Sequence, residues 1–310
     1  MSSILQLARL VSQTDVYGIW LSEDGSCDVF VQAEVAMRSA GNRRIGIGVS
    51  PWLHNISTIA RAAATLREID SERFRLSLRV GELPDLPSRG IEVRESYKIF
   101  AKTVDVLRKI WVGETLSLKT GNLELQQYLA RVRTGFTIPL YLDVRGQKLL
   151  TLAGRVANGV ILRGPVPYLK TAIEVVHGQA AHRKVGSRPR VVFWLPTLLV
   201  REKADRELAR TVAATIIADT PISVLKIAGI SDAAVATIQT VARERGYAEL
   251  SSHVNDELLN NFTISGDSRQ ICDAFLSLAK LGADEIVLGP PYGHDIFDSI
   301  SRIVKMWERG

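Results

Sequence analysis

The feature that most constrains the fold of this chain is a regular alternation of short apolar runs, rich in β-branched residues, with longer amphipathic runs. The short runs have the length of buried strands, and the long runs space their apolar residues by three and four, as one face of a helix requires. The clearest case is the run 95–111, in which Phe100, Val104 and Leu107 share a face. Strands separated by helices indicate right-handed crossovers and a parallel sheet.

Seven such strands follow a helix that we predict from Ser3 to Ser12. Eight strands close a TIM-type (β/α)8 barrel, so seven strands after a leading helix predict an α/β barrel that lacks its first strand. A doubly wound open sheet is the alternative, although no G-x-G-x-x-G follows the first strand. We expect a single barrel domain over 1–310, with a helical insertion over 222–262 before the last βα unit. The predicted strands begin at Val16, Arg44, Phe74, Pro139, Gly159, Arg190 and Glu285.

Composition and charge exclude several classes of protein. A chain of 310 residues with 46% hydrophobic residues can bury a substantial core, which excludes a disordered chain and a small disulfide scaffold. The formal net charge of +6 is too weak to indicate nucleic-acid binding. Cys27 and Cys272 lie far apart, and neither they nor the histidines show metal-ligand spacing, so we expect no metal and a reducing, cytoplasmic location. No apolar run reaches about 18 residues, so we expect no membrane partner.

Five segments that together span most of the chain carry a resemblance to a known family. They are YGIWLSED, RRIGIGVSPWLHN, ARAAATLREIDSERFRLSL, IPLYLDVRGQKLLTLAGRVANGVIL and VNDELLNNFTISGDSRQICDAFLSLAKLGADEIVLGPPYG. In this order they resemble the bacterial-luciferase-like superfamily of (β/α)8 barrels, and within it the branch that uses the deazaflavin coenzyme F-420 and includes the methylenetetrahydromethanopterin reductases. The resemblance implies an oxidoreductase that transfers a hydride between F-420 and a small organic substrate, such as a pterin, and that forms a homo-oligomer of two or more chains.

The chain departs from the family pattern in ways that keep other functions open. It begins inside the helix that follows the family's first strand, which fits either a late start or a partly open barrel of seven strands. Ser22, Glu23 and Asp24 stand where the family has Ser-Asp-His, so the acid is kept and the imidazole is lost. Arg79 and Glu82 occupy a turn that is glycine-rich in the family. The alternatives are an FMN-dependent monooxygenase or reductase on the same fold, and a redox-inactive barrel that serves as a binding protein.

The predicted ligand site lies in the loops after the carboxyl ends of the strands, where parallel barrels bind their ligands. Glu23, Asp24 and Glu82 are the candidate catalytic carboxyls, because desolvation at a barrel mouth raises the pKa of a carboxyl toward neutrality. The alternative is that these carboxylates pair with nearby arginines.

Three arginines at strand ends, Arg79, Arg145 and Arg163, predict an anion-binding site. Guanidinium groups that converge repel one another unless an anion lies among them, and their planar donors fit phosphate. A phosphorylated deazaflavin supplies such an anion. Alternatively, the arginines face solvent or pair with carboxylates such as Asp143.

A helix start and a strand end complete the predicted cofactor site. Gly146, Gln147 and Lys148 open a helix, whose unpaired N–H groups and positive dipole end attract phosphate, although an ordinary helix start is the alternative. By the resemblance, the segment Gly48, Val49 and Ser50 lies against the deazaflavin ring, and the Gly48–Val49 bond stands where the family has a cis non-prolyl peptide. A trans bond is the alternative. The aromatic candidates for the substrate pocket, each with plain packing as its alternative, are Trp52, His54 and Trp194.

Overall fold

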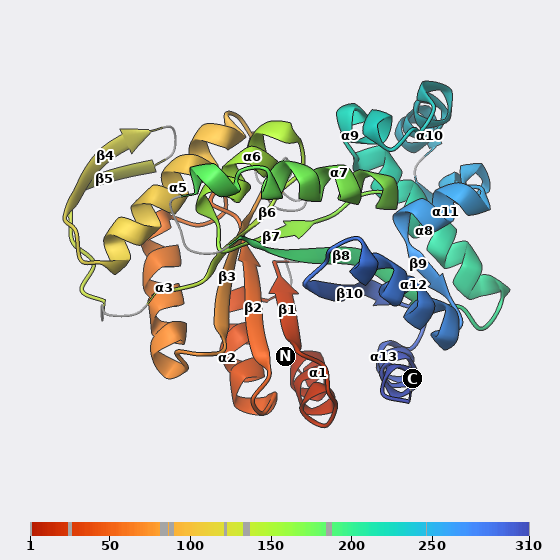
Figure 1. The fold of residues 1–310 in the computed structure, drawn as a ribbon, viewed down its shortest axis with the longest axis horizontal. Coiled ribbons are helices and arrows are strands. Elements are labelled where there is room, and N and C mark those ends of the chain that lie inside the picture. Colours follow the sequence, from red (N-terminus) through yellow and green to blue (C-terminus); the bar gives the residue numbers. More distant parts are fainter. Residues whose placement is uncertain are drawn as a thin grey trace. The chain divides into compact units, whose positions relative to one another are not determined.

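The structure of the chain, a computed structural model, describes residues 2–23, 27–80, 86, 90–120, 123–132, 137–183, 188–245 and 247–309. Figure 1 shows the order of its helices and strands. The chain divides into two compact units, which are described separately. Unit 1 comprises Met1–Val144, Leu152–Val160 and His182–Ser187, and unit 2 comprises Arg145–Thr151, Ile161–Ala181 and Arg188–Gly310.

Unit 1 is built on four parallel strands in which each strand pairs with the next. Strand β1 pairs with β2, β2 with β3, and β3 with β6. The strands are β1 (Gly18–Ser22), β2 (Arg44–Val49), β3 (Phe74–Arg79) and β6 (Leu140–Asp143). The helices are α1 (Ser2–Ser12), α2 (Val29–Ser39), α3 (Ile56–Ile69) and α5 (Ser96–Trp111), and Figure 1 shows α2 and α3 lying along the strands. A separate antiparallel hairpin consists of β4 (Leu116–Thr120) and β5 (Leu123–Tyr128).

The two faces of this sheet are packed by different kinds of residue. On β2, Ile45, Ile47 and Val49 are completely buried, and they alternate with Gly46 and Gly48. Because successive side chains of a strand point to opposite faces, the aliphatic residues share one face and the glycines share the other, which we call the inner face. The aliphatic face forms the core with the helices, since α2 and α3 also bury their apolar residues.

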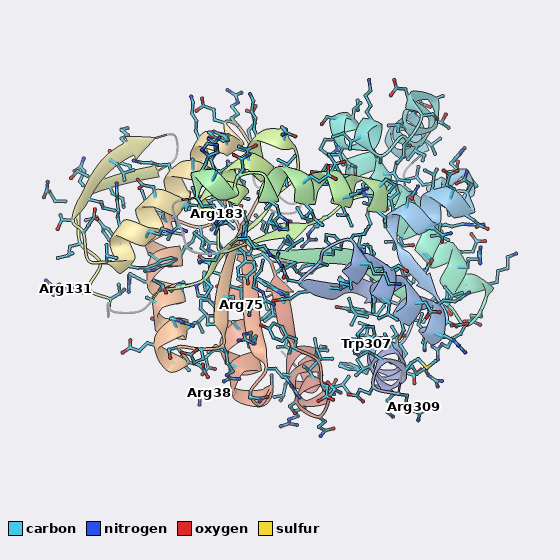
Figure 2. The ribbon with its side chains drawn as sticks, viewed as in Figure 1. Arg38, Arg75, Arg131, Arg183, Trp307 and Arg309 are labelled. Atoms are coloured by element: carbon cyan, nitrogen blue, oxygen red, sulfur yellow. The ribbon has the colours of Figure 1, made fainter. Side chains whose placement is uncertain are left out.

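Aromatic rings fill the inner face of unit 1 where the strands carry glycine. A Cβ on Gly46 would lie 2.6 Å from Cδ2 of Trp20, and a Cβ on Gly159 would lie 2.8 Å from Cζ of Tyr141. The two rings meet edge to face, with centroids 5.2 Å apart. Arg75, labelled in Figure 2, is buried on the same face and donates a hydrogen bond of 2.7 Å to the hydroxyl of Tyr17. The inner face is therefore filled with side chains around Trp20, Tyr141 and Arg75.

Unit 2 contains a longer pair of parallel strands and most of the C-terminal helices. Strand β8 (Arg190–Leu199) pairs with β10 (Glu285–Tyr292) and, near its end, with the short β9 (Ile264–Gly266). Elements that contain residues of both units are α6 (Gln147–Val156), β7 (Gly159–Leu162) and the turn η1 (Ala180–His182). The other helices are α7 (Val166–His177), α8 (Lys203–Asp219), α9 (Ile222–Ile227), α10 (Asp232–Arg245), η2 (Tyr247–His253), α11 (Asp256–Phe262), α12 (Ser268–Lys280) and α13 (Ile296–Trp307).

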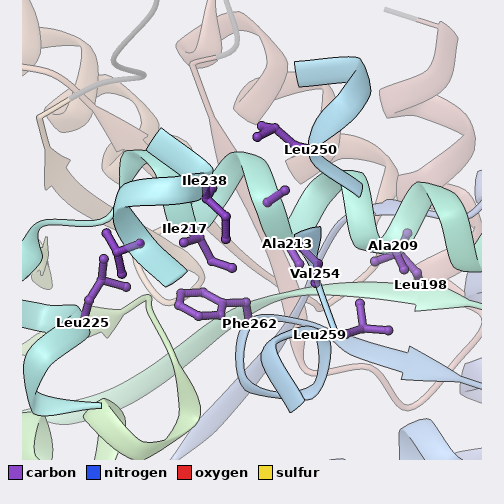
Figure 3. Close-up of a cluster of buried hydrophobic side chains, with 12 residues drawn as sticks. Leu198, Ala209, Ala213, Ile217, Leu225, Ile238, Leu250, Val254, Leu259 and Phe262 are labelled. Atoms are coloured by element: carbon purple, nitrogen blue, oxygen red, sulfur yellow. The ribbon is translucent and has the colours of Figure 1, made fainter. Parts of the chain in front are cut away.

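The segment 222–262 is helical and has its own apolar cluster with α8. Figure 3 shows that the cluster takes side chains from α8, from α9 to α11 and from the end of β8. Ile217, Leu225 and Phe262 are completely buried in it. This packing explains why an alanine-rich segment without strong amphipathic periodicity is folded.

Most of the predicted elements are present. All seven predicted strands form, the leading helix runs over Ser2–Ser12, and the described strand pairs of the main sheet are parallel, so the α/β class is confirmed. The short β9 was not predicted. Asp267 caps α12 by accepting hydrogen bonds from the backbone N–H groups of Arg269 and Gln270. Among the helices of the described ranges, none is long and apolar enough to cross a bilayer.

Candidate active site

A polar cluster lies at the carboxyl ends of the strands of unit 1. Glu23 follows β1, Ser50 and His54 follow β2, Arg79 ends β3, and Asp143 ends β6. Because the strands are parallel, their carboxyl ends share one edge of the sheet, which is where this class of fold binds its ligands.

The carboxylate of Glu23 joins two neighbouring loops. Its Oε1 contacts Nε2 of His54, and its Oε2 accepts a hydrogen bond of 3.0 Å from the backbone N–H of Ser50. The side chains of Glu23 and His54 are only 15% and 20% exposed. The ring of Phe30 from α2 meets the imidazole edge to face, with centroids 5.7 Å apart. The carboxylate and the imidazole are therefore a fixed pair that still reaches the surface.

Ser50 ties three loops together at this edge. It is completely buried, and its Oγ donates a hydrogen bond to the carbonyl oxygen of Val80 and accepts one of 3.2 Å from the N–H of Trp52. With the bond from its own N–H to Glu23, it connects the loops after β1, β2 and β3. A buried hydroxyl that both donates and accepts in this way fixes the backbone around it.

Arg79 and Asp143 form a buried ion pair beside this network. They are register partners on β3 and β6, Nε of Arg79 lies 3.8 Å from Oδ2 of Asp143, and their side chains are 7% and 9% exposed. A Cβ on Gly48 would lie 3.1 Å from Cδ of Arg79, so the stem of the arginine covers this glycine on the inner face. This pairing with Asp143 is the alternative that the sequence offered to anion binding by Arg79.

The other two predicted arginines belong to unit 2. The guanidinium of Arg163 stacks on the ring of Trp194, 4.1 Å from its centroid, and Nη2 of Arg145 lies 3.8 Å from Oδ2 of Asp219. A Cβ on Gly289 would lie 2.8 Å from Nε1 of Trp194, so the edge of this indole that carries Nε1 packs against β10. Convergence of the three arginines on one anion stays a prediction, because Arg79 belongs to unit 1.

The start of α6 is open to a ligand. Helix α6 begins at Gln147, as predicted, and Gly146 before it has a φ of 82°, which favours glycine. Nothing lies within 4 Å of the position that a Cβ on Gly146 would take. The N–H of Gly146 donates a hydrogen bond of 3.0 Å to the hydroxyl of Tyr168, and burial raises the pKa of that phenol. Lys148 lies in the first turn, and phosphate binding at this helix start stays a prediction.

Some predicted residues differ from expectation or lie beyond the description. The cis peptide implied by the resemblance is not found between Gly48 and Val49, and the cis bond of the described chain joins Pro290 to Pro291. The ring of Trp52, which is half-buried, packs edge to face on Phe100 of α5, 5.5 Å between centroids, and its place in a substrate pocket stays a prediction. Two predicted catalytic carboxyls, Asp24 and Glu82, lie outside the described residues.

Sequence reasoning missed the contact of His54 with Glu23. We expected His54 to line a substrate pocket and noted only that the imidazole of the family's Ser-Asp-His pattern is lost after β1. The signal was available, because β1 and β2 are neighbours and both residues follow strand ends. An imidazole lost from one loop is thus present at the same edge of the sheet on another.

The family is decided by comparison with known proteins. The sequence matches the luciferase-like monooxygenases over residues 1–285. The chain belongs to this family. Among curated proteins it is similar to the 5,10-methylenetetrahydromethanopterin reductase of Methanolobus tindarius, with 25% identity over 97% of this chain and 94% of the relative.

Two solved structures of F-420-dependent enzymes have the same fold as this chain. The coenzyme F-420 dependent tetrahydromethanopterin reductase from Methanopyrus kandleri matches with a TM-score of 0.84 and 18% identity, over 98% of this chain and 94% of that one. An F-420-dependent secondary alcohol dehydrogenase in complex with an F-420–acetone adduct matches with a TM-score of 0.73 and 16% identity, over 97% and 92% of the two chains. The TIM-type, luciferase-like fold is therefore confirmed.

Each unit of this luciferase-like chain, taken by itself, offers one feature that suits a part of a phosphorylated, flavin-like cofactor. The open backbone at Gly146, with Lys148 beside it, suits a phosphate. On the inner face of unit 1, Ser22, Gly48 and Ser77 are register partners, and the buried Oγ of Ser77 has no hydrogen-bond partner in the described part of the chain. A polar ring edge can satisfy such a hydroxyl. Within the same ranges, no cluster of three His, Cys, Asp or Glu side chains is arranged to bind a metal ion.

Proposed function

We propose that this luciferase-like oxidoreductase transfers a hydride between coenzyme F-420 and a small organic substrate. The observation that carries the proposal is the similarity to a methylenetetrahydromethanopterin reductase over 97% of the chain. The two structures that match with TM-scores of 0.84 and 0.73 are named as F-420-dependent, and they act on a pterin and on a secondary alcohol. Since the substrates of these proteins differ while the coenzyme is shared, the similarity supports the coenzyme more strongly than a particular substrate.

The residues of this chain then have separate tasks. When bound, F-420 supplies the hydride chemistry, which the protein does not provide itself. At the start of α6, the backbone N–H groups of the first helical turn and the positive charge of Lys148 hold phosphate, while Gly146 leaves the approach open. At the strand ends of unit 1, the pairs Glu23–His54 and Arg79–Asp143 present fixed polar groups with little exposed surface. Fixed dipoles and charges in such a site orient a substrate without reorganisation during the reaction.

Equilibrium titrations with F-420 and with FMN, followed by fluorescence, test the coenzyme. We expect F-420 to bind with a Kd on the order of micromolar, about −8 kcal/mol, and FMN to bind much more weakly. Gly146→Val should weaken the binding of F-420 about tenfold or more, because it closes the open backbone at the start of α6. Gly229→Val is the matched control, since Gly229 also has a positive φ, of 72°, and open space around its Cβ position but follows α9.

Two other experimental results would each favour a different function. Purified protein that is yellow and releases FMN on denaturation would support an FMN-dependent monooxygenase or reductase. Protein that binds neither cofactor would support a redox-inactive barrel with a binding role.

A further inference from the structure

We propose that His54 is the proton donor and acceptor of this site, and that Glu23 is the positioning residue that holds its imidazole. The inference deepens the proposed function and rests on it. Hydride transfer also requires a proton, which the hydride does not supply. The proposal assigns the transfer of this proton to His54, which follows β2. Glu23, which the sequence suggested as a catalytic carboxyl, then positions the imidazole and does not transfer the proton itself.

The hydrogen bonds of Glu23 show why it is the holder. Its two carboxylate oxygens face two different donors, Nε2 of His54 and the N–H of Ser50. Ser50 is itself fixed, because its Oγ is bonded to the carbonyl of Val80 and to the N–H of Trp52. A carboxylate that accepts from fixed donors with both oxygens is held in one orientation, as a positioning residue must be.

The environment of His54 suits a proton donor. Its Nε2 is directed at Glu23, which fixes the tautomer of the neutral ring and the plane of the charged one. Phe30 from α2 packs edge-on against the ring, and the N–H of His54 donates to the carbonyl of Ser50, so both ring and backbone are anchored. The side chain is 20% exposed, so a ligand at the strand ends can reach it.

The charged side chains described at this edge of unit 1 include Glu23, Arg79 and Asp143. Glu23 at the end of β1 contacts the ring of His54 directly, and Phe30 of α2 packs against the same ring. Arg79 and Asp143, at the ends of β3 and β6, form an ion pair with each other.

The proton balance of the proposed reaction requires such a group. When a hydride from the reduced coenzyme adds to carbon of a C=N or C=O bond, the electron pair of the π bond moves to the heteroatom, which then takes up one proton. The imidazolium of His54 gives its Nδ1 proton and becomes neutral, while its Nε2–H stays bonded to Glu23. Solvent returns the proton, and in the oxidative direction the neutral ring accepts the proton of an N–H or O–H group.

The test begins with protein that contains no cofactor. The titration of the His54 imidazole is followed by NMR in the wild-type protein and in Glu23→Gln, with the signal assigned by its loss in His54→Gln. We expect the midpoint of the titration to fall by at least one pH unit in E23Q, because a carboxylate in contact is replaced by a neutral amide. An unchanged midpoint would contradict the holding role of Glu23, and circular dichroism of each variant establishes that it is folded.

The second part measures hydride transfer with the proposed coenzyme. His54→Gln should leave the Kd of F-420 within about twofold of wild type, lower the rate of hydride transfer about 100-fold or more, and remove its dependence on pH between 5 and 8. His182→Gln, at an exposed position in η1, is the matched control and should react like wild type.

The outcomes separate this inference from the proposed function. If F-420 binds and H54Q transfers hydride at the wild-type rate with the wild-type pH profile, the role of His54 is overturned and the coenzyme assignment stands. If the wild-type protein binds no F-420, the coenzyme assignment fails and the donor role falls with it, while the NMR titration still decides whether Glu23 holds the imidazolium.

Discussion

The packing of Trp20 on Gly46 makes the substitution Gly46→Ala a sharp test of the inner face. A Cβ at this position would lie 2.6 Å from Cδ2 of Trp20 and closer still to two further ring atoms, whereas carbon atoms in contact prefer about 3.5–4.0 Å. The indole cannot move away freely, because it packs edge to face on Tyr141 with centroids 5.2 Å apart. Overpacking costs about 1–3 kcal/mol, and an overlap of this size belongs at the upper end.

A smaller, stabilising effect opposes the free-energy cost of overpacking. Replacing glycine by alanine at a compatible backbone position stabilises a protein by about 0.4–1 kcal/mol through the unfolded chain. We therefore expect G46A to lower the free energy of unfolding by about 2 kcal/mol, measured by urea denaturation with circular dichroism. Gly48→Ala, two residues along the same strand, is the control and should cost less than about 1 kcal/mol, since its Cβ would lie 3.1 Å from the nearest atom, Cδ of Arg79, and 3.8 Å from the backbone oxygen of Leu21.

A double-mutant cycle identifies the cause. On a Trp20→Ala background the space above Gly46 is empty, so the further change Gly46→Ala should cost less than about 0.5 kcal/mol. If G46A costs about 2 kcal/mol with and without the indole, the reasoning from the contact between Trp20 and Gly46 is refuted. If G46A costs nothing in the wild-type background, the inner face is not packed as described.

Three further substitutions test other parts of the account. Asp143→Asn leaves the buried guanidinium of Arg79 without its neighbouring carboxylate and should cost about 3 kcal/mol in urea denaturation, whereas a loss below about 1 kcal/mol would show that the pair is unimportant. Burial alone would raise the pKa of Asp284, but hydrogen bonds from the N–H of Val191 and from Arg188 lower it. The Asp284 carboxylate therefore stabilises the fold above about pH 4, and this stabilisation is lost as the pH falls further. Asp284→Asn should be less stable than wild type by about 1 kcal/mol at pH 7 and equally stable near pH 2. A difference in stability that does not depend on pH would contradict this. Tyr168→Phe removes the acceptor of the N–H that precedes α6 and should lower the free energy of unfolding by about 1 kcal/mol, and an unchanged value would show that water replaces the hydroxyl.

The strands could be predicted because parallel strands buried on both sides are short, nearly continuous apolar runs. The run Arg44–Val49 and the run Phe74–Arg79 were placed without error at their starts. Strand β9, only three residues long, was missed because so short a segment has no period of its own, and it forms only by pairing with the end of β8. Its existence is a consequence of tertiary packing.

The site was harder to predict than the fold. The rule that ligands meet the carboxyl ends of parallel strands correctly brought Glu23, Ser50, His54 and Arg79 to one edge of unit 1. The sequence did not show which of these side chains contact each other, because 31 residues separate Glu23 from His54 and the contact depends on two loop conformations. It also could not decide between anion binding and pairing for Arg79, since only register makes Asp143 its partner.

Competition between cofactors is the sharpest test of the proposal that this luciferase-like chain depends on F-420. Calorimetric titration of the protein with F-420, followed by addition of excess FMN to the complex, gives the stoichiometry and the preference in one experiment. From the proposed function we expect one F-420 bound per chain and no displacement by FMN. Displacement of F-420 by FMN, or no heat of binding with F-420, would contradict it.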